Sequence, residues 1–307
     1  MQFVVAAVFP GQGSQKVGMG RSLAERYSAA RSIFDTVGSA TGIDVRELCW
    51  GTDEETLRQT QNAQLALFTC SVAAWHVLLE AGRSAGAVAG HSVGEYAALV
   101  AAGVYRVDDA ARLVQIRGSL MAEAGKSAPG SMAAVLGLER ESLEQACESA
   151  GGLVVIANDN CPGQLVISGE VEAVGRASKA ASEMGAKGVR RLNVSGAFHS
   201  PLMETPARCM RESLDEYTAS RPEIDVYVNV TSEKLADALD VPELLEKQLM
   251  NPVRWTESVQ HMIRDGVTEF VELGSGEVLC GLIRRIDRSV KCGCVNSAES
   301  AGGWLLG

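Results

Sequence analysis

Residues Gly90-His-Ser-Val-Gly94 lie between the apolar run Gly86–Ala89 and the run Glu95–Ala102, which has a helix-like composition. A GxSxG sequence between a strand and a helix is typical of a nucleophile elbow, a sharp turn that holds the serine hydroxyl out of the sheet. Ser92 would lie at a helix N-terminus, where free N–H groups favour a developing oxyanion. An ordinary glycine-rich turn has the same five letters, so the interpretation depends on other residues.

The segment before residue 125 alternates apolar strands with amphipathic helices. Predicted strands cover 3–9 and 86–89, and predicted helices lie near 20–38, 62–81, 93–102 and 108–124. This alternation is typical of a parallel α/β sheet. With the elbow, it predicts an α/β-hydrolase-like domain.

The rhythm changes after Gly125-Lys-Ser-Ala-Pro-Gly130. Strands are predicted over 131–137, 153–157, 164–168 and 188–194, with helices near 139–149 and 171–184. The order β-α-β-β-α-β is that of a ferredoxin-like unit. Helices near 201–219, 242–249 and 255–265 and strands 225–230 and 269–273 follow. We therefore expect a discontinuous catalytic domain, 1–125 and 198–307, with an inserted ferredoxin-like subdomain at 126–197.

Composition excludes several classes of function. The 28 basic and 38 acidic residues give a net charge of −10, so we expect no nucleic-acid or membrane-surface partner. The eight cysteines form no CxxC pair, which favours reduced cytoplasmic thiols and no metal site. The apolar start, Met1–Phe9, lacks a basic region and is interpreted as a buried strand rather than a signal peptide. No apolar run is as long as the roughly 18 residues of a membrane helix.

A serine nucleophile needs a base, and histidine is the usual one. Of the four histidines, His76 and His261 lie in predicted helices and fit packing or surface roles, and the side chain of His91 should diverge from that of Ser92. His199 lies in a loop after the last predicted strand of the insert, before a helix. It is the histidine best placed to face Ser92 across a cleft between domains. No third acid is evident.

Arg117 is the next informative residue. Ala110, Leu113, Val114, Arg117 and Met121 share one face of a predicted helix. A guanidinium on a core-facing stripe is costly unless it meets an anion. It could bind a substrate carboxylate or pair with an internal Asp or Glu, and spacing does not decide between them.

The loop that ends the first strand, Phe9-Pro-Gly-Gln-Gly-Ser-Gln15, resembles a phosphate-binding loop at first sight. It lacks the third glycine of GxGxxG and the lysine of a P-loop, which excludes nucleotide binding. A backbone N–H of this loop could instead complete an oxyanion hole, which needs a donor from a second segment.

With these residues in place, the chain resembles the malonyl-CoA:acyl-carrier-protein transacylases of fatty-acid synthesis over nearly its whole length. The resemblance is carried by five ordered motifs: FPGQGSQ at 9–15, GHSVGEY at 90–96, NCPGQLVISG at 160–169, GAFHS at 196–200 and QLMNPVRW at 248–255. It implies that Ser92 is acylated and that His199 is its base. It also implies that the main-chain carbonyl of Gln248 orients His199, and that the N–H groups of Gln12 and Val93 form the oxyanion hole.

The resemblance further implies that Arg117 binds the malonyl carboxylate, with Met121, Gln64 and Asn160 lining the pocket. Phe198, before the histidine, resembles malonyl-selective members, so malonyl is the expected acyl group. The expected partners are malonyl-CoA, which is a substrate, and the acyl-carrier protein; no cofactor is expected.

The expected reaction is ping-pong: Ser92 takes the malonyl group, coenzyme A leaves, and the phosphopantetheine thiol of the carrier protein receives the group. We expect an acidic carrier protein to dock near Lys187, Arg190 and Arg191. Two alternatives stay open, a serine hydrolase or thioesterase that shares the elbow, and a catalytically silent module that binds acyl-carrier protein.

Overall fold

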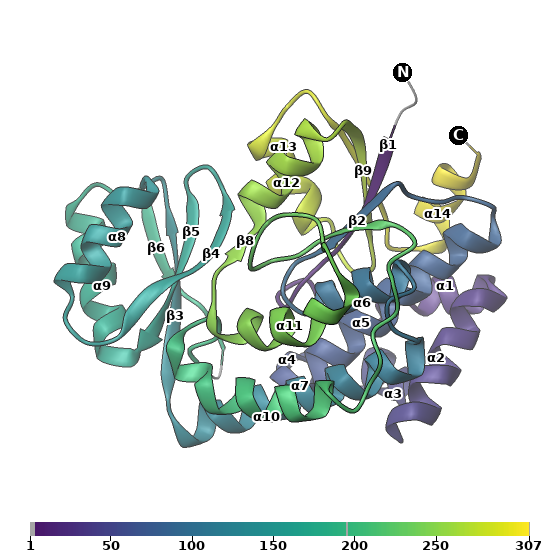
Figure 1. Cartoon of the computed structure of the whole chain (residues 1–307), viewed down its shortest axis with the longest axis horizontal. Coiled ribbons are helices and arrows are strands. Elements are labelled where there is room, and N and C mark those ends of the chain that lie inside the picture. Colours follow the sequence, from purple (N-terminus) through teal and green to yellow (C-terminus); the bar gives the residue numbers. More distant parts are fainter. Residues whose placement is uncertain (1–3, 195, 307) are drawn as a thin grey trace.

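The computed structural model describes residues 4–194 and 196–306, and its strands form two separate five-stranded sheets (Figure 1). Phe3, at the start of the first predicted strand, and Ser195, at the start of the loop that carries His199, lie outside the described residues. We call the sheet that holds the first strand sheet A and the other sheet B.

Sheet A is entirely parallel, in the order β10-β9-β1-β2-β7. Its strands are β1 (Val4–Phe9), β2 (Ala87–Gly90), β7 (Asp225–Tyr227), β9 (Val267–Leu273) and β10 (Lys291–Val295). Successive side chains of a strand face opposite sides of a sheet. Ala7 and Phe9 accordingly belong to one hydrophobic core, whereas Ala6 and Val8 belong to another. Sheet A is therefore buried on both faces, as parallel sheets generally are.

Helices cover both faces of sheet A. Those with residues in the core of Ala7 and Phe9 include α1 (Arg21–Arg26), α2 (Ser28–Thr41), α3 (Val45–Trp50), α4 (Glu54–Arg58), α5 (Thr60–Glu80), α6 (Gly94–Ala101), α7 (Val107–Ser127), α10 (Glu204–Leu214), α11 (Val241–Met250) and α14 (Ala298–Leu306). The core of Ala6 and Val8 takes in α12 (Trp255–Arg264) and α13 (Val278–Ile286). Two short 3-10 helices are η1 (Pro201–Met203) and η2 (Ala238–Asp240).

The helix α5 is apolar on every side, which fits a helix surrounded by protein. By length and composition it could cross a membrane, but 83% of its apolar window is buried inside the fold. It is the only such helix among the described residues.

Sheet B has the order β6-β3-β5-β4-β8, and its first four strands are antiparallel. It contains β3 (Gly130–Leu136), β4 (Val154–Cys161), β5 (Gln164–Glu170) and β6 (Gly188–Arg191), with α8 (Arg140–Ser149) and α9 (Val171–Glu183) packed on it. Figure 1 shows these two helices on the side of sheet B away from sheet A. The predicted fold class is confirmed, including the ferredoxin-like order of the insert.

The fifth strand of sheet B was not predicted. β8 (Val253–Arg254) follows α11 and pairs in parallel with Asn158 and Asp159 of β4. The hydroxyl of Thr256, at the start of α12, donates to the carboxylate of Asp159 over 2.5 Å. Chain from beyond residue 197 therefore completes sheet B and ties it to the helices of sheet A.

Several element bounds differ from the prediction. The helix expected near 20–38 is two helices, because Tyr27 between them is extended, with φ −115° and ψ 130°. The strands expected at 188–194 and 225–230 end earlier, at Arg191 and Tyr227. The helix expected near 201–219 ends at Leu214. The helices α3, α4, α13 and α14 and the strand β10 were not predicted.

The expectation of reduced thiols is wrong at two positions. Cys280 of α13 and Cys292 of β10 are joined in a disulfide, with their Cα atoms 5.5 Å apart. α13 packs on β9, and β10 pairs with β9 in sheet A. The tertiary packing of the two elements brings the cysteines together, and their spacing of 12 residues contains no local signal for it.

Candidate active site

The elbow has the strained geometry that its sequence predicts. β2 ends at Gly90 and α6 begins at Gly94, and Ser92 between them has φ 53°. A Cβ on Gly90 would lie 1.9 Å from the carbonyl carbon of Gly94, and a Cβ on Gly94 would lie 2.2 Å from the oxygen of Phe9. Both positions therefore require glycine. The turn places Ser92 between the end of β2 and the start of α6.

Asn229 holds the elbow from a second segment. Its side-chain oxygen accepts the N–H of Ser92 over 2.8 Å, and its side-chain nitrogen donates to the carbonyl of Gly90 over 2.6 Å. Asn229 lies just after β7, the sheet neighbour of β2. One amide thus satisfies two backbone groups of the turn, which supports the left-handed conformation of Ser92.

The structure brings Ser92 and His199 together. The serine hydroxyl lies 2.8 Å from Nε2 of His199, and Nδ1 of the same ring lies 2.7 Å from the main-chain oxygen of Gln248. A carbonyl oxygen only accepts, so Nδ1 must carry a proton. In a neutral ring Nε2 is then the free acceptor, facing the hydroxyl. This is the arrangement of a nucleophile, a base and an orienting group.

The surroundings of His199 keep the imidazole neutral. Burial and the positive charge of Arg117 lower its pKa to about 3, against a smaller raising effect of its bond to Gln248. His199 also has φ 55°, so both members of the pair have a left-handed backbone. The hydroxyl of Ser200 donates to the carbonyl of Ala197 over 2.6 Å and braces this turn.

Arg117 of α7 is fully buried and points at the serine. Its Nη2 donates to Ser92 Oγ over 3.0 Å and to Oε1 of Gln248 over 2.9 Å, and its Nη1 donates to Oε1 of Gln64 over 2.6 Å. Its Nε has no hydrogen-bond acceptor in the part of the chain that the structure describes. Among residues 4–194 and 196–306 it forms no ion pair with a carboxylate. The alternative of a direct internal Arg–Asp or Arg–Glu pair is thus not what the structure contains.

The two predicted oxyanion donors, Gln12 and Val93, come from two different segments of the chain. Gln12 belongs to the loop after β1 and Val93 follows Ser92, and both line the same cavity. Within the described residues, neither backbone N–H donates to another protein group. Ser275 donates its hydroxyl to the carbonyl of Ser14 over 2.7 Å, which holds the Gln12 loop against the end of β9. Two free N–H groups beside a serine hydroxyl can stabilise an oxyanion there.

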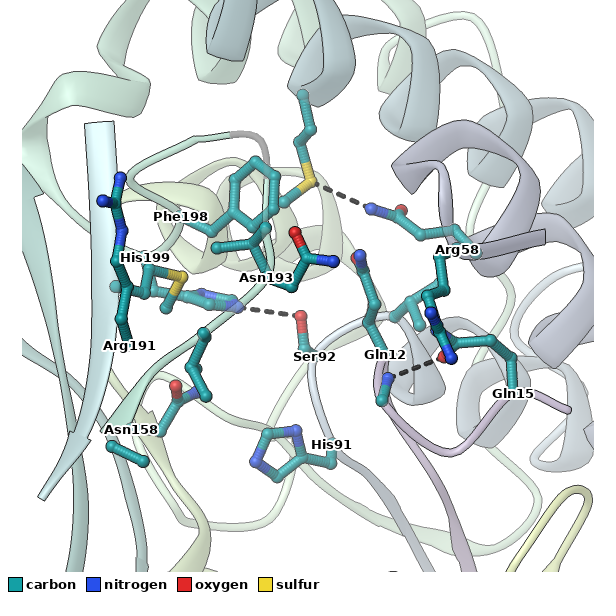
Figure 2. A pocket seen from close by; sticks show the side chains of 18 of the residues that line it. Gln12, Gln15, Arg58, His91, Ser92, Asn158, Arg191, Asn193, Phe198 and His199 are labelled. Atoms are coloured by element: carbon teal, nitrogen blue, oxygen red, sulfur yellow. Dashed lines mark hydrogen bonds between the residues drawn. The ribbon is translucent and has the colours of Figure 1, made fainter. Parts of the chain in front are cut away.

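The cavity around Ser92 has a volume of about 740 Å³. Figure 2 shows Ser92 between His199 and Phe198 on one side and Gln12 on the other. The other residues that line it are Gly13, Gln15, Arg58, Gln64, His91, Val93, Arg117, Met121, Met132, Ala134, Asn158, Arg190, Arg191, Leu192, Asn193 and Val194. Its walls come from both sheets and the helices beside them, so the cavity lies where the two sheets meet.

Met121, Gln64 and Phe198 line the cavity, as the resemblance implies, and Gln64 donates to the sulfur of Met121 over 3.3 Å. Asn160 is not among the lining residues. Its side-chain oxygen instead lies 2.8 Å from Nε2 of His91. Asn158, two residues earlier on β4, lines the cavity in its place.

Sequence reasoning missed two polar residues that hold the site, Glu95 and Asn229. Glu95 is 1% exposed in the first turn of α6, and its Oε2 accepts from Nε2 of Gln248 over 3.0 Å and from the N–H of Asn229 over 2.9 Å. A charged residue inside the apolar run 95–102 was a usable signal for a buried carboxylate. A polar residue at the end of an apolar strand was the weaker signal for Asn229.

Residues 7–304 match the family described as acyl transferase domain. The chain is 42% identical over 299 residues to the malonyl CoA-acyl carrier protein transacylase of Bacillus subtilis strain 168, covering 96% of this chain and 94% of that protein. The chain belongs to this transacylase family.

Solved transacylase structures have the same fold. The crystal structure of an acyl carrier protein S-malonyltransferase from Vibrio cholerae superposes with a TM-score of 0.94 at 40% identity, covering 98% of this chain and 99% of that one. A malonyl-transacylase in complex with its type II PKS acyl-carrier protein superposes with a TM-score of 0.95 at 39% identity, covering 99% of both chains. The two-sheet architecture described above is thus that of a transacylase fold.

Proposed function

We propose that this member of the family transfers a malonyl group from malonyl-CoA to the phosphopantetheine thiol of acyl-carrier protein, through a malonyl ester of Ser92. The observation that carries the proposal is the buried guanidinium of Arg117, which has no carboxylate partner among the described residues and lies 3.0 Å from the serine oxygen. A buried cation favours an anionic partner. The carboxylate of a malonyl group bound at Ser92 supplies one, and the planar guanidinium can bind it through two hydrogen bonds.

In the first half-reaction, Ser92 Oγ attacks the thioester carbon of malonyl-CoA while Nε2 of His199 takes the hydroxyl proton. The carbonyl oxygen becomes an oxyanion and is stabilised by the N–H groups of Gln12 and Val93. Collapse of the tetrahedral intermediate breaks the carbon–sulfur bond, and the imidazolium returns its proton to the sulfur. Coenzyme A then leaves as a thiol.

The second half-reaction uses the same groups in reverse. The phosphopantetheine thiol gives its proton to His199 and attacks the malonyl ester, and the serine oxygen recovers the proton as it leaves. The main-chain carbonyl of Gln248 accepts from Nδ1 throughout, so the imidazolium formed in each half is stabilised where it forms. Apart from the two substrates, every group in this scheme belongs to the chain, so the reaction as proposed needs no cofactor.

The remaining cavity residues shape the acyl site. We assign Gln64 and Met121 to the wall beside Arg117, and Phe198 to the wall beside His199, where its bulk limits substituents on the malonyl carbon. We propose that Asn160 contributes to the site indirectly. Its side chain bonds His91, the residue that precedes the nucleophile.

The carrier protein is proposed to dock beside the cavity on β6. Arg190 and Arg191 are exposed there and line the cavity mouth, and Lys187 precedes the strand. An acidic carrier would be attracted to these charges. Reversing all three to glutamate should raise the KM for carrier protein, and an unchanged KM for carrier protein would contradict this docking site. Lys291→Glu, at the start of β10, is the matched control.

The experiment that tests the function is intact-protein mass spectrometry after mixing with malonyl-CoA and no acceptor, for the wild type and Ser92→Ala. We expect a malonyl-sized increase in the wild type alone. Free coenzyme A accumulating without an adduct would indicate hydrolysis instead. No adduct and no coenzyme A would contradict malonyl-CoA as the donor, and failure of a fluorophosphonate to label Ser92 would indicate a catalytically silent module.

We also propose the division of the chain into a catalytic domain, 1–125 and 198–307, and an inserted subdomain, 126–197. It is supported by the separate hydrophobic core of sheet B, α8 and α9. A cytoplasmic location is proposed from the acidic composition and the coenzyme A substrate.

A further inference from the structure

Glu95 is a buried acid that the proposed reaction does not use. It lies three residues after Ser92, and its Oε2 accepts from Gln248 over 3.0 Å and from the N–H of Asn229 over 2.9 Å. Burial raises its pKa to about 7, and these two bonds and the charge of Arg117 act in the opposite direction. Burying an acid beside an active site has a desolvation cost, so its hydrogen bonds must have a compensating role. The two bonds indicate that Glu95 positions Gln248 and Asn229.

The first of these bonds fixes the direction of the Gln248 amide. Its nitrogen donates to Glu95 over 3.0 Å and to the carbonyl of Ser92 over 3.1 Å, and its oxygen accepts from Nη2 of Arg117 over 2.9 Å. Turning the amide over would place its oxygen against two acceptors and its NH2 group against the guanidinium. Glu95 and the Ser92 carbonyl therefore determine that the amide oxygen faces Arg117.

The side-chain amide of Gln248 separates the charges of Glu95 and Arg117, and this separation affects how a malonyl carboxylate would bind. If Glu95 contacted Arg117 directly, its carboxylate would compete with the malonyl carboxylate for the guanidinium. Because Gln248 lies between them, Glu95 compensates the charge of Arg117 at a distance. The guanidinium therefore stays available for the carboxylate of an acyl group in the cavity. The same contact aims Nη2 at Ser92 Oγ, 3.0 Å away, which is where the acyl group would be attached.

We propose that Glu95 is a positioning residue for acyl selectivity, which acts through the side chain of Gln248 to hold Arg117 in register with the carboxylate of an acyl group on Ser92. The inference rests on the proposed function, because it presupposes a carboxylated acyl donor. The second bond of Glu95, to Asn229, braces the elbow and affects every acyl donor alike. A change in the ratio of malonyl to acetyl loading therefore reports on the bond to Gln248 and not on the bond to Asn229.

The test is the ratio of kcat/KM for malonyl-CoA to kcat/KM for acetyl-CoA, measured as Ser92 loading, in the wild type, Glu95→Leu and Glu95→Gln. Glu95→Leu removes the acceptor and should lower the ratio by about 10- to 100-fold, as expected for a disturbed hydrogen bond to a charged group. Glu95→Gln keeps an oxygen that accepts both bonds, so its ratio should stay within about threefold of the wild type.

A double-mutant cycle shows whether Glu95 acts through Arg117. In an Arg117→Ala background, Glu95→Leu should change the ratio by less than about threefold, because the group that it positions is gone. If Glu95→Leu fails to fold, Gln248→Met keeps the main-chain carbonyl that holds His199 and should lower the ratio in the same way.

An unchanged ratio in a folded Glu95→Leu or Gln248→Met protein would overturn the inference, as would an equal fall in the Arg117→Ala background. A Glu95→Gln ratio as low as that of Glu95→Leu would also overturn it, because hydrogen bonding would then not be the cause. These results differ from failure of the proposed function, in which the wild type itself forms no malonyl ester.

Discussion

Replacing Arg117 by alanine separates recognition of the acyl carboxylate from the chemistry of the serine. A malonyl group would lose a paired charge and up to two hydrogen bonds, whereas an acetyl group has no carboxylate to lose. The guanidinium is fully buried and reaches Ser92 Oγ over 3.0 Å. The effect should therefore be large for malonyl-CoA and small for acetyl-CoA.

The size of the effect follows from the contacts. A hydrogen bond to a charged group contributes about 1.5–3 kcal/mol, so two such bonds give about 3–6 kcal/mol. Water entering the space left by the side chain will solvate the carboxylate in part, which favours the lower value. We expect kcat/KM for malonyl-CoA to fall about 100-fold or more. Acetyl loading loses only the one bond to the serine oxygen, about 1.5 kcal/mol at the lower value, and should fall by about tenfold.

Single-turnover loading followed by intact mass measures both reactions on one protein. Arg112→Ala is the matched control, because Arg112 lies on the same helix but is half-exposed and paired with Asp109. Arg117→Lys keeps the charge without the planar fork and should fall between the wild type and the alanine variant. Equal losses for malonyl and acetyl would refute the reasoning and make Arg117 a structural residue.

Three further predictions concern pH, stability and thiols. Because the pKa of His199 is lowered to about 3 and the base works unprotonated, kcat/KM for malonyl loading should stay level from pH 8 down to about 5; a half-maximal point near 6.5 would contradict the buried, neutral imidazole. Burial raises the pKa of Glu272 from 4.5 to about 7, so the folded protein holds that proton more tightly than the unfolded chain, and the resulting stability is lost as the pH rises between those values. Between pH 4.5 and 7, the unfolding free energy of Glu272→Gln measured by urea titration should therefore fall by about 3 kcal/mol less than that of the wild type. An equal fall in the two proteins would contradict this prediction. The denatured but unreduced protein should take up six iodoacetamide labels, and eight would mean that Cys280 and Cys292 are free thiols.

The parts of this molecule that sequence predicts well are those with local causes. Alternation of apolar segments gave the fold class, and the glycines of the elbow gave Ser92, because the turn is sterically impossible without them. Helices α3 and α4 were missed although each has a capping aspartate, Asp44 and Asp53, because six- and five-residue helices carry too little periodicity. The two-residue strand β8 forms only because β4 offers it an edge, and it has no pattern of its own.

The same distinction applies within the site. His199 could be inferred because few histidines were available and its loop position was informative. Glu95 and Asn229 were missed because their function lies in contacts 134 to 153 residues apart in the chain, with each other and with Gln248. Local patterns do not encode such contacts. The disulfide between α13 and β10 was missed for the same reason.

The left-handed backbone of Ser92 and His199 has a consequence for anyone who evolves this protein in the laboratory. Each conformation costs on the order of 1–3 kcal/mol for a residue that is not glycine, and the two φ angles are 53° and 55°. Glycine would relieve that cost at either position, and in the proposed mechanism it would remove the nucleophile or its base. A library sorted for heat resistance alone will therefore enrich inactive proteins, so turnover must be measured in the same round of sorting.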